Sequence, residues 1–214
     1  MPIIHDDQIK VIQVPHMGPY NNNGYILADP ISEECYLVDA PGDIGRLFEE
    51  AAGLKIKGVL LTHTHPDHIA GYPDLKQFYD VEIGVHPNDA GRLPDTPGFI
   101  LAHNQMLNLG ETIQIRVLHT PGHTEGSICL SMPNCLISGD TLFPGGPGYT
   151  RSADDFRQII TSITGLFEAL PAEALVLPGH GNITTIGTCK NEYSLFSGKS
   201  HPEDLFGHVN WLNN

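Results

Sequence analysis

The chain has 214 residues, of which 40% are hydrophobic and 17% charged, a balance typical of a folded globular protein and not of a disordered one. No apolar run approaches the roughly 18 residues that a membrane-spanning helix needs, and residues 1–10 lack the apolar core of a secretory signal. With 25 acidic and 11 basic residues, the formal net charge of −14 disfavours nucleic-acid and membrane partners. We expect one domain over residues 1–214, located in the cytoplasm.

Short apolar runs alternate with helical patterns along the chain. In the first half, the pattern predicts strands at 9–14, 24–28 and 35–38, a helix at 44–52, a strand at 58–61, a helix at 67–79 and a strand at 81–86. Two prolines and a glycine predict a surface loop over residues 92–105. In the second half we expect strands at 112–118, 127–131 and 135–138, an amphipathic helix at 156–170 and a strand at 174–177. The segment after Cys189 receives no assignment.

Each half of the chain is rich in strands and also carries helices, which indicates an α/β protein with packed sheets and helices outside them. The four cysteines show no CxxC spacing and are interpreted as buried thiols in a reducing compartment. The twelve histidines are the compositional anomaly, because several of them cluster with Gly, Pro, Thr and Asp directly after predicted strands. Loops that follow neighbouring strands converge at one edge of a scaffold, so a shared site is expected there.

The strongest cluster is His63-Thr64-His65-Pro66-Asp67-His68, directly after the strand at 58–61. In an extended loop, His63 and His65 face the same side and can share one ion, while Asp67 and His68 would open the next helix and face a second. Imidazole nitrogen and carboxylate oxygen suit zinc, iron or manganese. The competing interpretation is a polar turn that binds nothing, which three histidines and an aspartate in six residues make unattractive.

Three shorter motifs each combine a strand end, a glycine and a residue able to bind metal. They are Pro121-Gly122-His123-Thr124, Ser138-Gly139-Asp140-Thr141 and Pro178-Gly179-His180-Gly181. Taken singly, His123 could be a cap, Asp140 a turn former and His180 an ordinary loop residue. Taken with the HTHPDH cluster, they indicate one metal centre. His86 is assigned to a strand end, His103 to the surface and His119 to a supporting position or a loop, and the Asn-rich residues 20–23 are assigned to a turn.

HTHPDH, PGHT, SGDT and PGHG in this order resemble the metallo-β-lactamase fold superfamily, over about residues 24–180. The resemblance implies a four-layer αβ/βα sandwich with the site at one edge of the two sheets. It places His63, His65 and His123 on a first metal ion and Asp67, His68 and His180 on a second. Asp140 would bridge the two ions. Typical dinuclear β-lactamases of the superfamily carry a cysteine at the position of Asp140, so antibiotic hydrolysis is not expected.

Within the superfamily, the run 139–143, the Gly-rich stretch 144–148 and the run 179–185 are most similar to glyoxalase II-like hydrolases. In that branch a basic residue after the Gly-rich stretch helps to hold glutathione. Tyr149 stands there in this chain and Arg151 follows two residues later, so these two residues are the expected substrate contacts. Residues after 180 are too few for the extra helical domain that contacts glutathione in larger members.

The resemblance therefore implies a dinuclear metal-dependent hydrolase of a small acyl ester, with two divalent ions, zinc first and iron or manganese as alternatives. A thioester of the glyoxalase II type is the leading substrate, because a thiolate leaving group needs little protonation. Asp67 is the expected catalytic residue, since it faces the second ion and can orient the attacking water. The alternatives are a lactone hydrolase, a mononuclear iron sulfur dioxygenase acting on persulfides, and a metal-binding protein without catalysis. The oligomeric state is not indicated.

Overall fold

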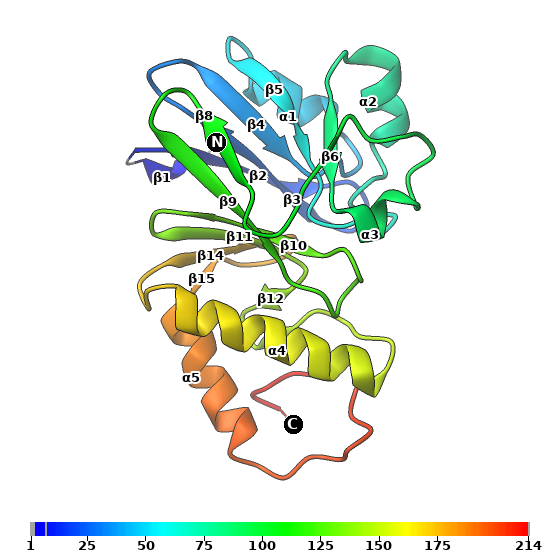
Figure 1. Ribbon diagram of the computed structural model, residues 1–214, viewed down its shortest axis with the longest axis vertical. Coiled ribbons are helices and arrows are strands. Elements are labelled where there is room, and N and C mark those ends of the chain that lie inside the picture. The colour runs from blue at the N-terminus through cyan, green and yellow to red at the C-terminus, as the bar shows by residue number, and fades with distance from the viewer. Residues whose placement is uncertain (1–2, 7, 214) are drawn as a thin grey trace.

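The computed structural model describes residues 3–6 and 8–213, so residues 1, 2, 7 and 214 of the predicted 1–214 domain lie outside the described residues. Thirteen strands form two large sheets (Figure 1). The first sheet has the order β1 (Ile3–Asp6), β2 (Lys10–Met17), β3 (Asn22–Ala28), β4 (Glu34–Val38), β5 (Lys55–Leu60), β6 (Ile83–Val85) and β7 (Phe99–Ile100). The second has the order β15 (Thr184–Thr185), β14 (Leu175–Pro178), β11 (Cys135–Gly139), β10 (Ile128–Met132), β9 (Ile113–His119) and β8 (Met106–Leu109).

The helices cover the outer faces of the two sheets (Figure 1). Those on the first sheet are α1 (Gly45–Glu50), α2 (Tyr72–Phe78) and α3 (Pro87–Ala90), and those on the second are α4 (Ala153–Ala169) and α5 (Ile186–Ser197). A two-stranded ribbon, β12 (Leu142–Phe143) with β13 (Gly146–Pro147), lies between β11 and α4 in the sequence. No helix in the described part of the chain has the length and apolar character needed to cross a bilayer.

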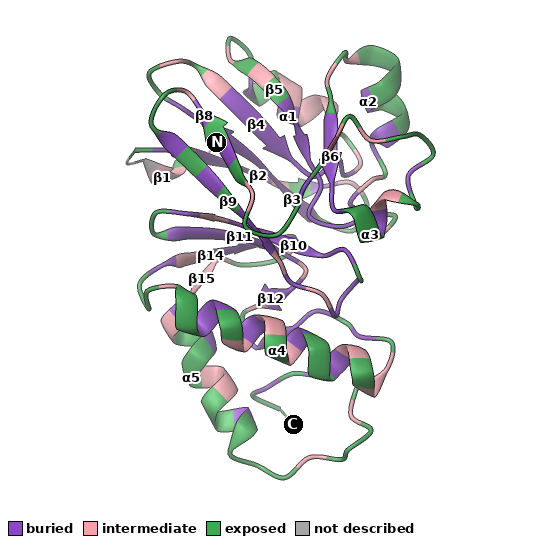
Figure 2. Cartoon of the chain, in the orientation of Figure 1, coloured by how far each residue is buried: buried purple, intermediate pink, exposed green. Residues whose placement is uncertain are grey.

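Most strands are buried on both faces of their sheet, which explains why they are apolar almost throughout, whereas β8 and β9 alternate buried and exposed residues. In β2, Val11 points into the core between the sheets, whereas Ile12 points towards α1 and α2. This alternation follows from the two-residue period of a strand. On the far side, Ile159 and Ile163 of α4 pack against the second sheet. Figure 2 shows mostly buried central strands, alternating buried and exposed residues along β8 and β9, and helices that are buried on one face only. The helix–sheet–sheet–helix order confirms the predicted four-layer αβ/βα class.

The sequence misplaced one element that bears on the site. The predicted helix 67–79 begins only at Tyr72, because residues 66–71 form turns and Pro73 is suited to the first turn of a helix. Asp67 and His68 therefore lie in a turn and do not open the helix. The predicted loop 92–105 contains the short edge strand β7, and the unassigned tail contains most of α5. All four cysteines are buried free thiols, as predicted.

Candidate metal centre

The loop between β5 and α2 carries four of the seven predicted ligands. β5 is paired in parallel on both sides, with β4 and β6, so its carboxyl end opens at the edge of the first sheet. His63 and His68 are buried, whereas His65 and Asp67 are partly exposed at the mouth of the site. The turn at 66–68, closed by a hydrogen bond from the His68 amide to the His65 carbonyl, aims all four side chains to one side.

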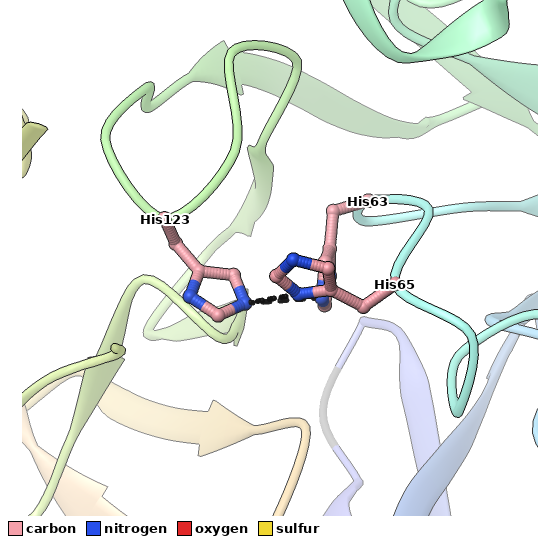
Figure 3. Close-up of side chains that lie close together, drawn as sticks. All are labelled: His63, His65 and His123. Carbon is pink, nitrogen blue, oxygen red and sulfur yellow. Dashed lines mark hydrogen bonds between the residues drawn. The ribbon is translucent and has the colours of Figure 1, made fainter. Parts of the chain in front are cut away.

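The second sheet supplies the other three side chains. His123 lies between β9 and β10, Asp140 follows β11 and His180 follows β14. Since β11 and β14 are parallel neighbours, the side chains that follow their carboxyl ends emerge next to each other. Figure 3 shows His123 on its loop facing His63 and His65, which share the loop after β5. The structure thus brings together all seven residues that the sequence predicted.

The seven side chains fall into groups with the dimensions of metal sites. Nδ1 of His65 lies 2.7 Å from Nε2 of His123, which lies 3.2 Å from Nε2 of His63. One ring presents Nδ1 and two present Nε2, so three nitrogens converge on one point. This group matches the set that the resemblance assigns to the first ion.

A second group forms beside the first. Nε2 of His180 lies 3.1 Å from Oδ2 of Asp67 and 3.2 Å from Nε2 of His68. The carboxylate of Asp140 lies between the groups, with Oδ1 at 3.3 Å from Nε2 of His68 and Oδ2 at 3.6 Å from Nε2 of His123. Asp140 is therefore the only described carboxylate that approaches a histidine of each group.

Outer hydrogen bonds fix the direction of the rings. Nδ1 of His68 donates to Asp39, Nδ1 of His123 donates to the carbonyl of Tyr149, and Nδ1 of His180 donates to the carbonyl of Tyr20, at 2.8, 2.8 and 3.1 Å. With the proton held on Nδ1, the lone pair of Nε2 points inward. Such outer partners are the usual means of orienting histidine ligands of metals.

The protonation states of three ligands already suit metal binding, whereas two others must lose a proton. Burial lowers the pKa of His63 well below its usual value and that of His65 to about 4, so both rings are neutral near pH 7. Burial by itself would raise the pKa of Asp67, but the hydrogen bond from His180 and the charge of His68 outweigh it and lower that pKa. Neutral imidazoles and ionised carboxylates are the forms that coordinate metals. Burial alone would lower the pKa of His68 and of His180, but the nearby carboxylates outweigh it and raise both, so a metal ion would displace a proton from these rings.

The donor set fits a metal, because one buried acceptor is otherwise unused. Oδ1 of Asp140 is shielded from solvent and accepts no hydrogen bond from the described residues. An unpaired buried carboxylate oxygen is costly, and a cation among these donors removes that cost. Nitrogen and oxygen donors of this kind suit zinc, iron or manganese, so the cluster is able to bind metal ions.

Two glycines beside Asp140 cannot be replaced by a larger residue, because there is no room for a Cβ atom. A Cβ on Gly148 would lie 2.0 Å from the carbonyl oxygen of Asp140, and one on Gly179 would lie 2.4 Å from Oδ1 of Asp140. Both are far below contact distance. Gly148 and Gly179 therefore allow the backbone to pass directly behind the carboxylate of Asp140.

Sequence reasoning missed the supporting residues. Asp39, at the end of β4, accepts hydrogen bonds from His68 and from the amide of Thr62, with a backbone φ of 62° that is uncommon outside glycine. Asn22, assigned to a turn, donates to Oδ2 of Asp67 at 2.9 Å. The available signal was an acidic or amide residue next to a strand end, which is too common to stand out without the structure.

Asp89 of α3 is a third missed residue and joins the two ligand loops. Its carboxylate accepts from the amide of Thr64 at 2.9 Å, from the hydroxyl of Thr124 at 2.9 Å and from the amide of Gly126 at 3.0 Å. Thr64 lies between His63 and His65, and Thr124 follows His123. One buried carboxylate thus sets the spacing between the first-sheet and second-sheet loops.

A pocket of about 490 Å³ opens directly onto the centre. Asp67, His123, Asp140 and His180 form its floor, and its walls come from Tyr20, from residues 143–149 and from residues 208–210 of the tail. The tail could not be placed from the sequence, yet it forms one wall of the pocket. Trp211, which is fully buried, anchors it by donating its amide to the carbonyl of Gly145 at 2.7 Å.

The two predicted substrate contacts lie on different sides of the centre. Tyr149 lines the pocket, is 41% exposed and packs on His208, with 4.9 Å between ring centroids. Arg151 faces a neighbouring depression, and its Nη2 lies 3.2 Å from Nε2 of His65. Tyr149 therefore stands at the pocket wall and Arg151 behind the first group of histidines.

Comparison with known proteins agrees with this geometry. The chain is 33% identical to the hydroxyacylglutathione hydrolase GloC of Haemophilus influenzae over 212 residues, covering 88% of this chain and 99% of that protein. Among solved structures it is similar to the B3 metallo-β-lactamase BLEG-1, with a TM-score of 0.73 and 29% identity, covering 83% of this chain and 95% of that one. It is also similar to TTHA1623 in a di-iron-bound form, with a TM-score of 0.65 and 29% identity over 83% of this chain and 96% of that one.

A family model described as the metallo-beta-lactamase superfamily matches residues 17–180, a range that contains all seven candidate ligands. That range runs from the last residue of β2 to just beyond the end of β14. From the fold, the histidine–aspartate cluster and this match, we conclude that the chain belongs to the metallo-β-lactamase superfamily.

Proposed function

We propose that the protein is a dinuclear metal-dependent hydrolase of small acyl esters, and that its substrate is a thioester of the type cleaved by glyoxalase II enzymes. The observation that carries this proposal is the pair of ligand groups joined by Asp140 at the floor of an open pocket. Structural metal sites are usually closed sets of four ligands, whereas a site that opens to a pocket leaves room for water and substrate.

In this proposal His63, His65 and His123 hold one ion, Asp67, His68 and His180 hold the other, and Asp140 contacts both. Zinc is the expected metal, with iron and manganese as alternatives. When bound, two such ions supply Lewis-acid activation of a water molecule and of a carbonyl oxygen. The di-iron form of TTHA1623 supports a site for two ions in a protein of this fold.

Asp67 is the proposed catalytic residue. Its Oδ2 is held by Asn22 and His180, and its carboxylate reaches the pocket floor. An ionised carboxylate fixed in this way can orient a water molecule and accept its proton as the water attacks an acyl carbon. No acid in the described part of the pocket is needed for the leaving group if that group is a thiolate, which departs without protonation.

The similarity to a hydroxyacylglutathione hydrolase supports a thioester over other esters. A lactone is the alternative substrate, because its ring opens by the same attack on an acyl carbon. A mononuclear iron dioxygenase acting on persulfides is the alternative activity. It would leave one of the two ligand groups without a metal.

Metal analysis and three assays on the purified protein separate these functions. We expect about two ions per chain. We also expect hydrolysis of S-lactoylglutathione, which is monitored through the thiol that it releases. Opening of homoserine lactones without thioester cleavage would replace the thioester proposal with the lactonase. One iron per chain with oxygen uptake on glutathione persulfide would overturn the hydrolase. Nitrocefin serves as the control for antibiotic hydrolysis and is expected to remain intact.

A further inference from the structure

We infer that Arg92 and Arg151 form an anion-binding subsite beside His65, which selects acyl substrates that carry a carboxylate on one arm. The inference rests on the proposed hydrolase function and adds to it the charge of the substrate. The two arginines come from segments 59 positions apart in the chain and line one open depression together with His65, Pro66, Ile69 and Pro73.

The pairing of cations at this place is unusual for so acidic a chain. Only 11 of the 214 residues are Lys or Arg, against 25 acidic residues. Other arginines are occupied, for example Arg46 by two backbone carbonyls and Arg116 by the side chain of Asn104. The side chain of Arg92, in contrast, is exposed and has no hydrogen-bond or carboxylate partner among the described residues, although it carries five donors.

The side chain of Arg151 has one hydrogen-bond partner among the described residues, His65, and this ring could no longer accept the bond once it held a metal ion. A guanidinium can only donate, so the 3.2 Å contact with His65 requires a free lone pair on Nε2 of that ring. Nδ1 of His65 is the nitrogen that faces His123 and the proposed ion. With Nδ1 bound to metal, a neutral ring carries its proton on Nε2 and cannot accept from Arg151. The guanidinium then has no acceptor among the described residues and is available to an anion.

The backbone holds both arginines in place. The amide of Arg92 donates to the carbonyl of Asp89, the residue that ties the two ligand loops together. Arg151 lies between the buried Thr150 and Ser152, whose hydroxyl accepts from the amide of Asp155 and caps α4. These contacts order the backbone from which the two exposed arginine side chains extend into the depression.

The apolar floor indicates what accompanies the anion. Pro66, Ile69, Ala70 and Pro73 line the same depression as the two arginines. A short aliphatic arm ending in a carboxylate fits such a surface, because arginine pairs with carboxylates through parallel N–H donors. The acyl group itself would lie at the metal centre, and the arm would extend past His65.

A matched pair of thioesters tests the subsite on the metal-loaded enzyme. The first is S-lactoyl-3-mercaptopropionate, which carries a carboxylate, and the second is its neutral methyl ester. We expect kcat/KM for the anionic thioester to exceed that for the neutral one by about tenfold, which is about 1.36 kcal/mol, because only the anion can accept charged hydrogen bonds from the arginines. Arg92→Gln and Arg151→Gln should each reduce this ratio, mainly through KM, and Arg92→Lys should restore part of it. Arg116→Gln is the control and should keep the ratio.

A ratio near one in the wild type, or an unchanged ratio in Arg92→Gln, would overturn the subsite. Binding is also measured without turnover, by titrating the metal-loaded protein with methanesulfonate while following the arginine Nε–Hε signals by NMR. We expect two arginine signals to shift until saturation. One of them should be missing from Arg92→Gln and the other from Arg151→Gln. If neither thioester is cleaved but these shifts appear, the thioesterase proposal is wrong and the subsite stands. If only uniform shifts with added salt appear, the subsite is wrong.

Discussion

Asp39 accepts a hydrogen bond from Nδ1 of His68 at 2.8 Å, and both side chains are almost fully shielded from solvent. The same carboxylate accepts from the amide and the hydroxyl of Thr62, one position before His63. Asp39 therefore orients a ring of the second ligand group and fixes the start of the loop that carries the first.

We expect Asp39→Asn to weaken metal binding by about 10- to 100-fold, the usual effect of removing an outer partner of a histidine ligand. The neutral amide still fills the space but no longer favours the proton on Nδ1 of His68. Competition with a chelator of known affinity measures the change. Asp204→Asn, an exposed substitution, is the control. Wild-type affinity in a folded Asp39→Asn protein would contradict the orienting role.

Asp140→Asn should lower metal occupancy at both positions, because one carboxylate approaches a histidine of each ligand group. Elemental analysis after gel filtration gives the number of ions per chain. Loss of one ion only, with the other retained at full occupancy, would show that Asp140 does not serve both.

Asp67→Ala should reduce kcat for the thioester by about 10²- to 10⁴-fold while the fold remains intact. The side chain is only partly buried and lies in a turn, so its removal leaves the sheets unaffected. The rate is measured on protein reloaded with metal, and circular dichroism checks the fold. Substantial activity in a metal-loaded variant would remove Asp67 from the mechanism.

His86 gives a prediction about pH. Its ring stacks on His119 with 3.9 Å between centroids, and burial, followed by the charge of His119, lowers the pKa of His86 to about 4. Between pH 4 and its usual value of 6.5, the unfolded chain binds more protons here than the folded one, so this residue destabilises the fold as the pH falls through that range.

His86→Asn keeps an acceptor for the amide of Asn88 and removes the titrating ring. Between pH 7 and pH 4.5, the unfolding free energy of the variant should fall by about 1–2 kcal/mol less than that of the wild type, allowing for solvent screening. Urea unfolding in the presence of a chelator measures this difference without a metal contribution. Parallel stability curves for the two proteins would contradict the prediction.

Trp211 should be the most sensitive residue of the tail. It is fully buried and packs against Phe167, Tyr193 and Phe196, with centroid distances of 6.5, 5.2 and 6.4 Å. Trp211→Ala should cost about 3–5 kcal/mol of unfolding free energy, as large deletions in a core do. It should also raise KM, because residues 208–210 form a pocket wall.

Leu212→Ala is the matched control, since Leu212 is 52% exposed. Its effect should stay within about 0.5 kcal/mol. An equal effect of both substitutions in urea unfolding would show that the tail is not anchored through Trp211.

The amino-acid sequence by itself determined the parts of this protein that depend on local pattern. The HTHPDH run and the three Gly-containing motifs named all seven side chains that the structure brings together, because each motif directly follows an apolar strand. The alternating and continuous apolar runs were sufficient to predict an α/β protein of packed sheets with helices outside them, and the resemblance carried by the motifs implied the four-layer class. Element ends were less accurate where turns decide them, as at residues 66–71 before α2.

Tertiary structure alone decided which distant residues support and surround those seven. Asp39, Asp89 and Asn22 are ordinary acidic or amide residues in sequence, and only the meeting of separate loops places their side chains at hydrogen-bonding distance from the site. The pocket wall at residues 208–210 and the placement of Arg92 and Arg151 around one depression likewise depend on how separate segments of the chain pack together. Four of the ligands share one loop, so their close spacing is visible in the sequence. Supporting contacts need only proximity in space, and the spacing of residues along the chain does not reveal that.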